Sequence, residues 1–235
     1  MKALLITSGK GGTGKTLLAS NIAIVLSEKM RVALIDADMR APNLTYVMGI
    51  ANKRLDVDKN RLIIPYKYND NLQVFSTEHY FARDNGLHKA IILPGETIRS
   101  MVKQAVKSVA WNKPDIFVID SDPSTSDVLI SLAELFGKDL SAIVVTTNDI
   151  SSIFDCERTV DALKIEGIGI IGIVGNMIWD NDDHRIIDLA KKLNIPYLGY
   201  IPFDHRIRNA NNNGQALMPD INIIRRIVEN GHIDR

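Results

Sequence analysis

A glycine-rich segment near the amino terminus has the residue types and the spacing to bind phosphate groups. It runs Gly9-Lys-Gly-Gly-Thr-Gly-Lys-Thr16 and fits the pattern G-x-x-x-x-G-K-[ST], directly after an apolar run and before a helical pattern. Glycines let backbone N–H groups turn toward phosphate oxygens, and the start of a helix adds partial positive charge. We expect Lys15 to reach the β- and γ-phosphates of a nucleotide and the Thr16 hydroxyl to bind Mg²⁺. The expected nucleotide-binding residues of this segment are Gly11, Gly12, Thr13, Gly14, Lys15, Thr16 and Leu17.

Three aspartates stand at the ends of apolar runs further along the chain. Asp36 and Asp38 follow one run, and Asp120 ends another. Side chains alternate along a strand, so Asp36 and Asp38 share a side, and ligands bind at the carboxyl ends of strands in open α/β sheets. Carboxylates at that edge indicate water-mediated binding of Mg²⁺ and orientation of an attacking water. The alternatives are a plain glycine turn for the loop and helix caps for Asp36 and Asp38.

These residues need a scaffold, and the rest of the chain shows alternating strand and helix patterns. The apolar runs are continuous, which is typical of strands buried on both faces of a parallel sheet. The expected strands cover residues 3–7, 32–36, 72–75, 116–120, 142–146, 168–174 and 197–201. The expected helices cover residues 15–28, 97–109, 127–136, 151–165, 184–193 and 221–228. We expect one doubly wound α/β domain over residues 1–235, with a mostly parallel sheet flanked by helices and a loop or insertion at 51–71.

Composition narrows the classes of function. The 235 residues include 28 basic and 28 acidic side chains, and zero net charge argues against a uniformly basic nucleic-acid-binding surface. The single cysteine, Cys156, can form no internal disulfide and cannot alone bind zinc or an iron–sulfur cluster. The sequence shows no signal peptide and no apolar run of about 18 residues, which predicts a soluble, cytoplasmic protein without an integral membrane segment. Zinc-ligand spacing and a G-x-S-x-G motif are absent, so metal hydrolases and serine esterases have no support.

Lys10, the first of the two lysines in the glycine-rich segment, is the less common feature of this motif. Lys10-Gly-Gly-Thr-Gly-Lys-Thr16 resembles the deviant Walker A motif of the MinD/ParA/Mrp group of P-loop ATPases. The resemblance implies the P-loop NTPase fold and an ATP-dependent homodimer, in which Lys10 contacts the nucleotide phosphates of the other subunit. It also implies that Asp38 activates water and that Asp36 and Asp120 hold Mg²⁺ through water molecules. The expected catalytic residues are therefore Lys10, Lys15 and Asp38, with a solvated loop lysine as the alternative for Lys10.

Further motifs resemble the Mrp branch of this group. The stretch 36–49 and the segment Asp120-Ser-Asp-Pro-Ser-Thr-Ser-Asp127 are similar to its two switch regions, and the resemblance covers about residues 2–215. It implies that the adenine side of the nucleotide site is formed by Asn176, Met177, Pro202, Phe203 and Asp204.

Two departures from the Mrp pattern affect what the protein is expected to carry. No C-x-x-C follows Asn176, and two copies of Cys156 would supply two thiolates where a cluster needs four, so we expect no bound iron–sulfur cluster. In the second switch region, Ser124 and Ser126 replace glycines and Asp122 replaces a proline, which predicts altered sensing of the γ-phosphate or slow hydrolysis. Trp179 is expected to be a buried aromatic residue, with lining of the nucleotide or of an interface as the alternative.

These observations together predict a Mg²⁺-dependent ATPase that binds ATP and ADP, switches as a homodimer and serves an unidentified protein partner, linked to metallocofactor assembly. The alternative is a positioning or partitioning ATPase that acts on a membrane surface, DNA or a protein complex. A third class is a nucleotide-binding regulator with little turnover. The amphipathic pattern at 221–228 is expected to pack on the core rather than on a membrane, and the scattered basic pairs are read mainly as solvated faces.

Overall fold

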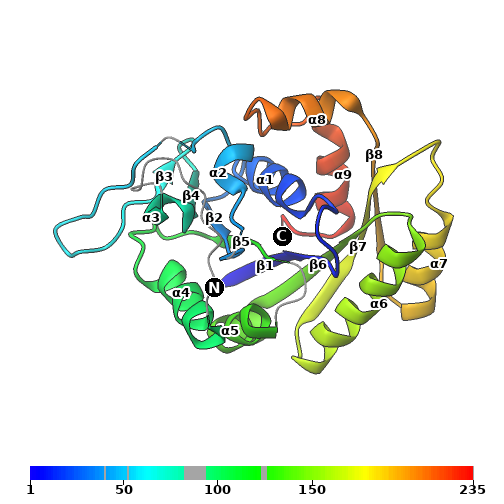
Figure 1. Cartoon of the computed structure of the whole chain (residues 1–235), viewed down its shortest axis with the longest axis horizontal. Coiled ribbons are helices and arrows are strands. Elements are labelled where there is room, and N and C mark those ends of the chain that lie inside the picture. The colour runs from blue at the N-terminus through cyan, green and yellow to red at the C-terminus, as the bar shows by residue number, and fades with distance from the viewer. Residues whose placement is uncertain (40, 52, 82–93, 123–125, 235) are drawn as a thin grey trace.

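The computed structural model describes residues 1–39, 41–51, 53–81, 94–122 and 126–234. Within these ranges one eight-stranded sheet has the strand order β3-β4-β2-β5-β1-β6-β7-β8 (Figure 1). The strands are β1 Lys2–Thr7, β2 Val32–Asp36, β3 Tyr66–Lys67, β4 Leu72–Ser76, β5 Ile116–Asp120, β6 Leu140–Thr146, β7 Gly169–Ile178 and β8 Tyr197–Pro202. Neighbouring strands are parallel except at one edge, where β3 runs antiparallel to β4.

The central strands explain why the apolar runs are continuous. β2 and β5 are buried along their whole lengths, and β1 is buried after its first residue. Alternate side chains of β1 enter two separate apolar cores, with Ala3 and Leu5 on one face and Leu4 and Ile6 on the other. The mostly parallel, doubly wound sheet predicted from the sequence is therefore confirmed.

Helices cover both faces of the sheet. In chain order they are α1 Lys15–Leu26, α2 Leu44–Val47, α3 Glu78–Phe81, α4 Gly95–Lys107, α5 Ser126–Phe136, α6 Ile150–Ile165, α7 His184–Leu193, α8 His205–Asn212 and α9 Asn222–Asn230. Residues of α4 to α7 contribute to the core on one face, and residues of α1, α2, α8 and α9 contribute to the core on the other (Figure 1). None of the helices in the described ranges is long and apolar enough to cross a bilayer.

The last helix packs on the core, as the sequence predicted. Ile224, Ile227 and Val228 of α9 are buried, and the helix contacts α1 and β8. Burial of each such side chain contributes about 1.5–3 kcal/mol to the stability of the fold.

Apart from shifts of a few residues at element ends, the structure differs from the expected elements in several places, and the short helices α2 and α3 were not predicted. The region 51–71, expected to be a loop, contains β3 and a bridge between Val57 and Ile63. β7 continues to Ile178, because its glycines interrupt the apolar pattern without interrupting the strand. α8 was not predicted, since Ile207 is its one apolar residue larger than alanine and no helical stripe results.

Candidate functional site

The glycine-rich segment forms the turn between the end of β1 and the start of α1. Gly12 and Gly14 have φ angles of 77° and 92°, in the left-handed region that favours glycine. Gly14 immediately precedes α1, and a Cβ atom there would lie 2.0 Å from Nδ2 of Asn176. Glycine at position 14 is therefore required both by the backbone conformation and by the close approach of β7.

Lys15, the first residue of α1, is 7% exposed and is held by oxygen atoms of the loop. Its Nζ donates to Ser8 Oγ at 3.1 Å and to the Lys10 carbonyl at 3.5 Å. Burial lowers the pKa of Lys15, and nearby carboxylates oppose this effect: those of Asp120, Asp38 and Asp122. The loop thus fixes a partly desolvated cation beside carboxylates, at the start of a helix that itself favours anions.

Ser8 belongs to this site and was not predicted. Its hydroxyl donates to the Lys10 carbonyl at 2.7 Å and accepts a hydrogen bond from Thr13 Oγ1 at 2.9 Å. Ser8 therefore links both halves of the loop to Lys15. In the sequence, the only indication of this role is that Ser8 directly precedes the motif.

Asp120 ends β5, the strand beside β1, and is 2% exposed. Desolvation raises its pKa to about 7, although a hydrogen bond from the Thr16 hydroxyl and the charge of Lys15 act in the opposite direction. No donor among the described residues reaches its Oδ1 atom. A buried carboxylate oxygen without a donor, beside a threonine hydroxyl, fits a hard cation such as Mg²⁺, which prefers oxygen ligands and retains water.

Asp36 lies directly across from Asp120 in the sheet register and is fully buried. Its carboxylate accepts hydrogen bonds from Ser76 Oγ at 3.0 Å, from the Leu44 N–H at 3.2 Å and from the Asp38 N–H at 3.1 Å. Desolvation, followed by the charge of Asp120, raises its pKa well above the ordinary value. Asp36 thereby joins the ends of β2 and β4 to the start of α2.

Asp38 and Lys10 occupy more accessible positions. Asp38 is half-buried, and its Oδ1 accepts a hydrogen bond from the Ala41 N–H at 2.9 Å. Lys10 is exposed, and its Nζ donates to Ser151 Oγ near the start of α6 at 3.0 Å. Within one copy of the chain, the Lys10 ammonium group is thus held at the surface beside α6.

The residues expected on the adenine side gather at the carboxyl ends of β7 and β8. Asn176 is buried, and its Nδ2 donates to the Thr13 carbonyl at 2.7 Å. Thr13 belongs to the glycine-rich segment 9–16, which is called the phosphate loop from here on. Met177 has a φ of 57° and an exposed side chain. The Phe203 N–H donates to the Ile178 carbonyl at 2.8 Å, while Asp204 pairs with Arg206. Pro202 is the last residue of β8.

The expectation that Trp179 is buried is wrong, because its side chain is 60% exposed. It follows the last residue of β7 and stacks on Phe203 with ring centroids 3.9 Å apart. The sequence could not show this, since an aromatic residue after a strand packs equally well inward or outward.

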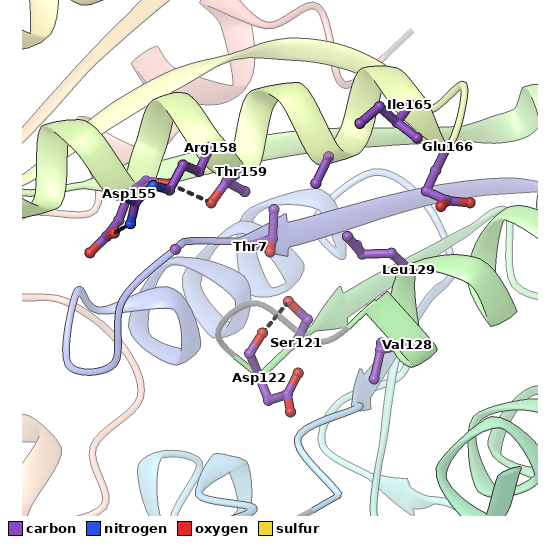
Figure 2. Close-up of a pocket in the computed structure, with 12 residues that line it drawn as sticks. Thr7, Ser121, Asp122, Val128, Leu129, Asp155, Arg158, Thr159, Ile165 and Glu166 are labelled. Carbon is purple, nitrogen blue, oxygen red and sulfur yellow. Dashed lines mark hydrogen bonds and ion pairs between the residues drawn. The ribbon is translucent and has the colours of Figure 1, made fainter. Parts of the chain in front are cut away.

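A cavity of about 370 Å³ lies beside the phosphate loop, on the face of the sheet that carries α5 and α6. Figure 2 shows Thr7 at the end of β1, Asp122 after β5, and Asp155 and Thr159 on α6 around this space. Gly9 also lines it, and a Cβ there would lie 2.3 Å from the Asp155 carbonyl oxygen. α6 therefore packs tightly against the first residue of the motif. The switch-region serine at 124 lies outside the described residues, and of Ser126 only its place at the start of α5 is described.

Cys156 is buried within α6, as expected of a small helix residue. Burial, together with the charge of Glu157, raises the pKa of its thiol to about 12. In the part of the chain that the structure describes, no three or more His, Cys, Asp and Glu side chains form a group able to hold a metal ion.

A doubly wound sheet with a glycine loop between β1 and α1, a buried lysine at the helix start and aspartates at neighbouring strand ends defines a P-loop NTPase. Residues 1–229 match the ParA family model, described as NUBPL iron-transfer P-loop NTPase, and the chain belongs to this family of P-loop NTPases. The resemblance to the MinD/ParA/Mrp group is thereby confirmed.

Relatives and solved structures agree with this assignment. The iron-sulfur cluster carrier protein of Rickettsia typhi is 35% identical over 210 residues, which cover 89% of this chain and 64% of the relative's length. The cytosolic Fe-S cluster assembly factor Nubp2 homolog of Aedes aegypti is 31% identical, with 93% of this chain and 89% of the relative covered.

Two solved structures share the fold. A nucleotide-binding protein from Archaeoglobus fulgidus in complex with ADP superposes with a TM-score of 0.74 at 20% identity, over 94% of this chain and 90% of that one. The septum site-determining protein MinD from Pyrococcus horikoshii, complexed with Mg-ADP, gives a TM-score of 0.69 at 24% identity, over 97% and 95% of the two chains.

Proposed function

We propose that this chain is a Mg²⁺-dependent ATPase that switches as a homodimer and serves iron–sulfur cluster assembly. The observation that carries the proposal is the buried Lys15 ammonium group held by the loop, beside an Asp120 oxygen that lacks a donor among the described residues. A cation and an open carboxylate oxygen at a helix start are suited to Mg²⁺ and a triphosphate.

The proposed roles follow from the positions of the side chains. Lys15 binds the terminal phosphates, and the backbone N–H groups of Gly11 to Leu17 surround them. Thr16 and Asp120 hold Mg²⁺, with Asp36 acting through water, and the ion neutralises charge that develops on the transferred phosphoryl group. Asp38 orients the attacking water from its half-buried position.

The homodimer in this proposal depends on Lys10. In one copy its Nζ contacts Ser151 on α6 at the surface. The exposure of this cation at the start of the phosphate loop supports a role in trans, in which Lys10 contacts a nucleotide held by a second copy and stabilises transition-state charge there. Hydrolysis then removes the γ-phosphate that Lys10 contacts, and the dimer opens.

The molecular mass of the protein in solution, measured with ATP and with ADP, tests the proposed homodimer switch. Asp38→Ala should bind ATP without hydrolysing it, so light scattering with ATP and Mg²⁺ should show twice the monomer mass, while ADP leaves the monomer. Lys15→Ala is the matched control and should stay monomeric, because it lacks the phosphate-binding cation. An unchanged mass of Asp38→Ala at saturating ATP would overturn the homodimer.

The link to iron–sulfur assembly rests on the names of the relatives, an iron-sulfur cluster carrier and a cytosolic Fe-S cluster assembly factor homolog. In this chain the one thiol is buried, with a pKa of about 12, so it does not offer a thiolate ligand near neutral pH. We therefore propose that the chain supplies the ATP-driven switch and that a partner protein holds the cluster as cargo.

Anaerobic incubation with iron and sulfide tests this division of labour. The chain alone should develop no visible cluster absorbance, and Cys156→Ala should behave identically. Stable absorbance that disappears in Cys156→Ala would show that this chain holds a cluster itself.

A further inference from the structure

The carboxylate of Glu78, two residues after the end of β4, is bonded to the short helix α2. Glu78 is 8% exposed, and its Oε2 accepts a hydrogen bond from the hydroxyl of Thr45, which is fully buried. Partial burial, followed by the charge of Glu78 and a hydrogen bond to its carboxylate, raises the pKa of the Tyr46 hydroxyl. Because burying a carboxylate is costly without donors, two hydroxyls of α2 hold a charge that packing alone would not require.

The backbone of Glu78 connects the same helix to Asp36. Its N–H donates to Ser76 Oγ at 3.2 Å, and Ser76 Oγ donates to the Asp36 carboxylate at 3.0 Å. That carboxylate accepts the N–H of Leu44, the first residue of α2, at 3.2 Å. With the bond from Thr45 to Glu78, these contacts form a closed ring of hydrogen bonds, which we call the β4–α2 ring. All five of its residues are buried.

The β4–α2 ring fixes the far end of the segment that carries Asp38. Asp38 and Leu44 both donate their N–H groups to the Asp36 carboxylate, so the segment begins and ends on the same side chain. The helix that follows, α2, has four residues, far fewer than the roughly 12 that an isolated helix needs to be stable. Its position therefore depends on contacts such as those of Glu78.

We propose that Glu78 is a positioning residue for ATP hydrolysis, which holds α2 in place so that Asp38 keeps its orientation. This inference rests on the proposed function, because it requires Asp38 to orient the attacking water. Misplacement of a reacting group by about 1 Å can lower a rate about 100-fold, so a contact outside the nucleotide site can still control turnover. The length of the Glu78 side chain, and not its charge, is what this role requires.

Two substitutions separate length from charge. Glu78→Asp keeps the charge but is one methylene group shorter, so it should lose the bonds to α2, and kcat should fall about tenfold or more. Glu78→Gln keeps the length and can bond to both hydroxyls, as acceptor to one and donor to the other, so it should retain most of the wild-type kcat. The KM for ATP should stay unchanged in both, since the β4–α2 ring includes no residue of the phosphate loop. An active Glu78→Asp beside an inactive Glu78→Gln would overturn the proposal.

Thr45→Val tests the same bond from the helix side, because it removes the hydroxyl at nearly constant volume. It should lower kcat as much as Glu78→Asp does, and the double variant should be no slower than either single variant. Val74→Ala is the matched control: Val74 is buried in β4 and outside the ring, so its loss destabilises the strand while kcat at 25 °C should stay near the wild-type value. An equal loss of kcat in Val74→Ala would assign the effect to general destabilisation.

Amide hydrogen exchange without nucleotide gives a readout that is independent of activity. The amides of residues 41–48 should exchange faster in Glu78→Asp and Thr45→Val than in the wild type and Val74→Ala. Unaltered exchange in these two variants would show that the ring does not hold α2. A wild-type chain without ATPase activity would refute the proposed function itself. Normal wild-type turnover that is matched by Glu78→Asp and Thr45→Val would refute the positioning role alone.

Discussion

At the scale of single residues, Asp120 shows the conflict between stability and function most clearly. Its carboxylate is buried at the end of β5, with Lys15 and the Thr16 hydroxyl offsetting only part of the desolvation. The buried Asp120 carboxylate destabilises the nucleotide-free protein, yet it is retained where Mg²⁺ is proposed to bind. Such a conflict is common at functional sites.

Asp120→Asn should therefore stabilise the nucleotide-free protein in a pH-dependent way. The pKa of Asp120 is raised to about 7 in the folded protein, so the folded state binds more protons than the unfolded state between about pH 4 and 7. Stability from this group is present at low pH and is lost as the pH rises through 7. The variant should gain up to about 4 kcal/mol over the wild type at pH 8, and less at pH 5.

Denaturant unfolding at both pH values measures this difference. Asp161→Asn, an exposed change on α6, serves as the control and should alter stability by less than about 0.5 kcal/mol at either pH. An equal gain for Asp120→Asn at pH 5 and pH 8 would contradict the assignment of a buried charge.

At the scale of elements, the phosphate loop is shaped by the strands beside it as much as by its own glycines. Gly14 combines a φ of 92° with the close approach of Asn176 from β7, whereas a Cβ at Gly11 would meet nothing within 4 Å. Two glycines of one motif thus have different structural requirements, although the pattern alone treats both as part of a flexible turn.

Gly14→Ala should destabilise the empty protein by about 1–3 kcal/mol, because the added methyl group imposes backbone strain and displaces Asn176. Gly11→Ala should cost less than about 0.5 kcal/mol. Thermal unfolding without nucleotide compares the two. If both variants lose the same stability, the contact between β7 and the loop does not constrain the turn.

At the scale of the whole molecule, the proposed dimer depends on Lys10 acting on a second copy. Lys10→Ala should retain ATP binding through Lys15 and lose most of its turnover, because the charge supplied in trans is missing. Asp38→Ala should also be inactive, but it still carries Lys10.

Mixing the two inactive variants separates action in trans from action in cis. A dimer with one copy of each has one complete site, so an equal mixture should recover about a quarter of the wild-type rate of phosphate release, since half of the dimers are mixed. A mixture as inactive as its components would mean that Lys10 serves its own subunit.

The fold class and the position of the phosphate loop could be predicted from residue patterns alone. The pattern of residues 9–16 and the continuous apolar runs are local properties, because glycine conformations and burial on both sheet faces act directly on neighbouring residues. The doubly wound parallel sheet and the family followed from them. The roles predicted for Lys10, Asp38 and the adenine-side residues remain predictions.

Residue patterns did not reveal which side chains meet across strands that are far apart in the chain. The register that sets Asp36 opposite Asp120, the bond from Asn176 to the loop and the participation of Ser8 depend on strand order and packing. The exposure of Trp179 was likewise mispredicted, because the direction of a side chain after a strand is set by its neighbours in space. Residue types specify which chemistry is available, and packing specifies which groups come together to perform it.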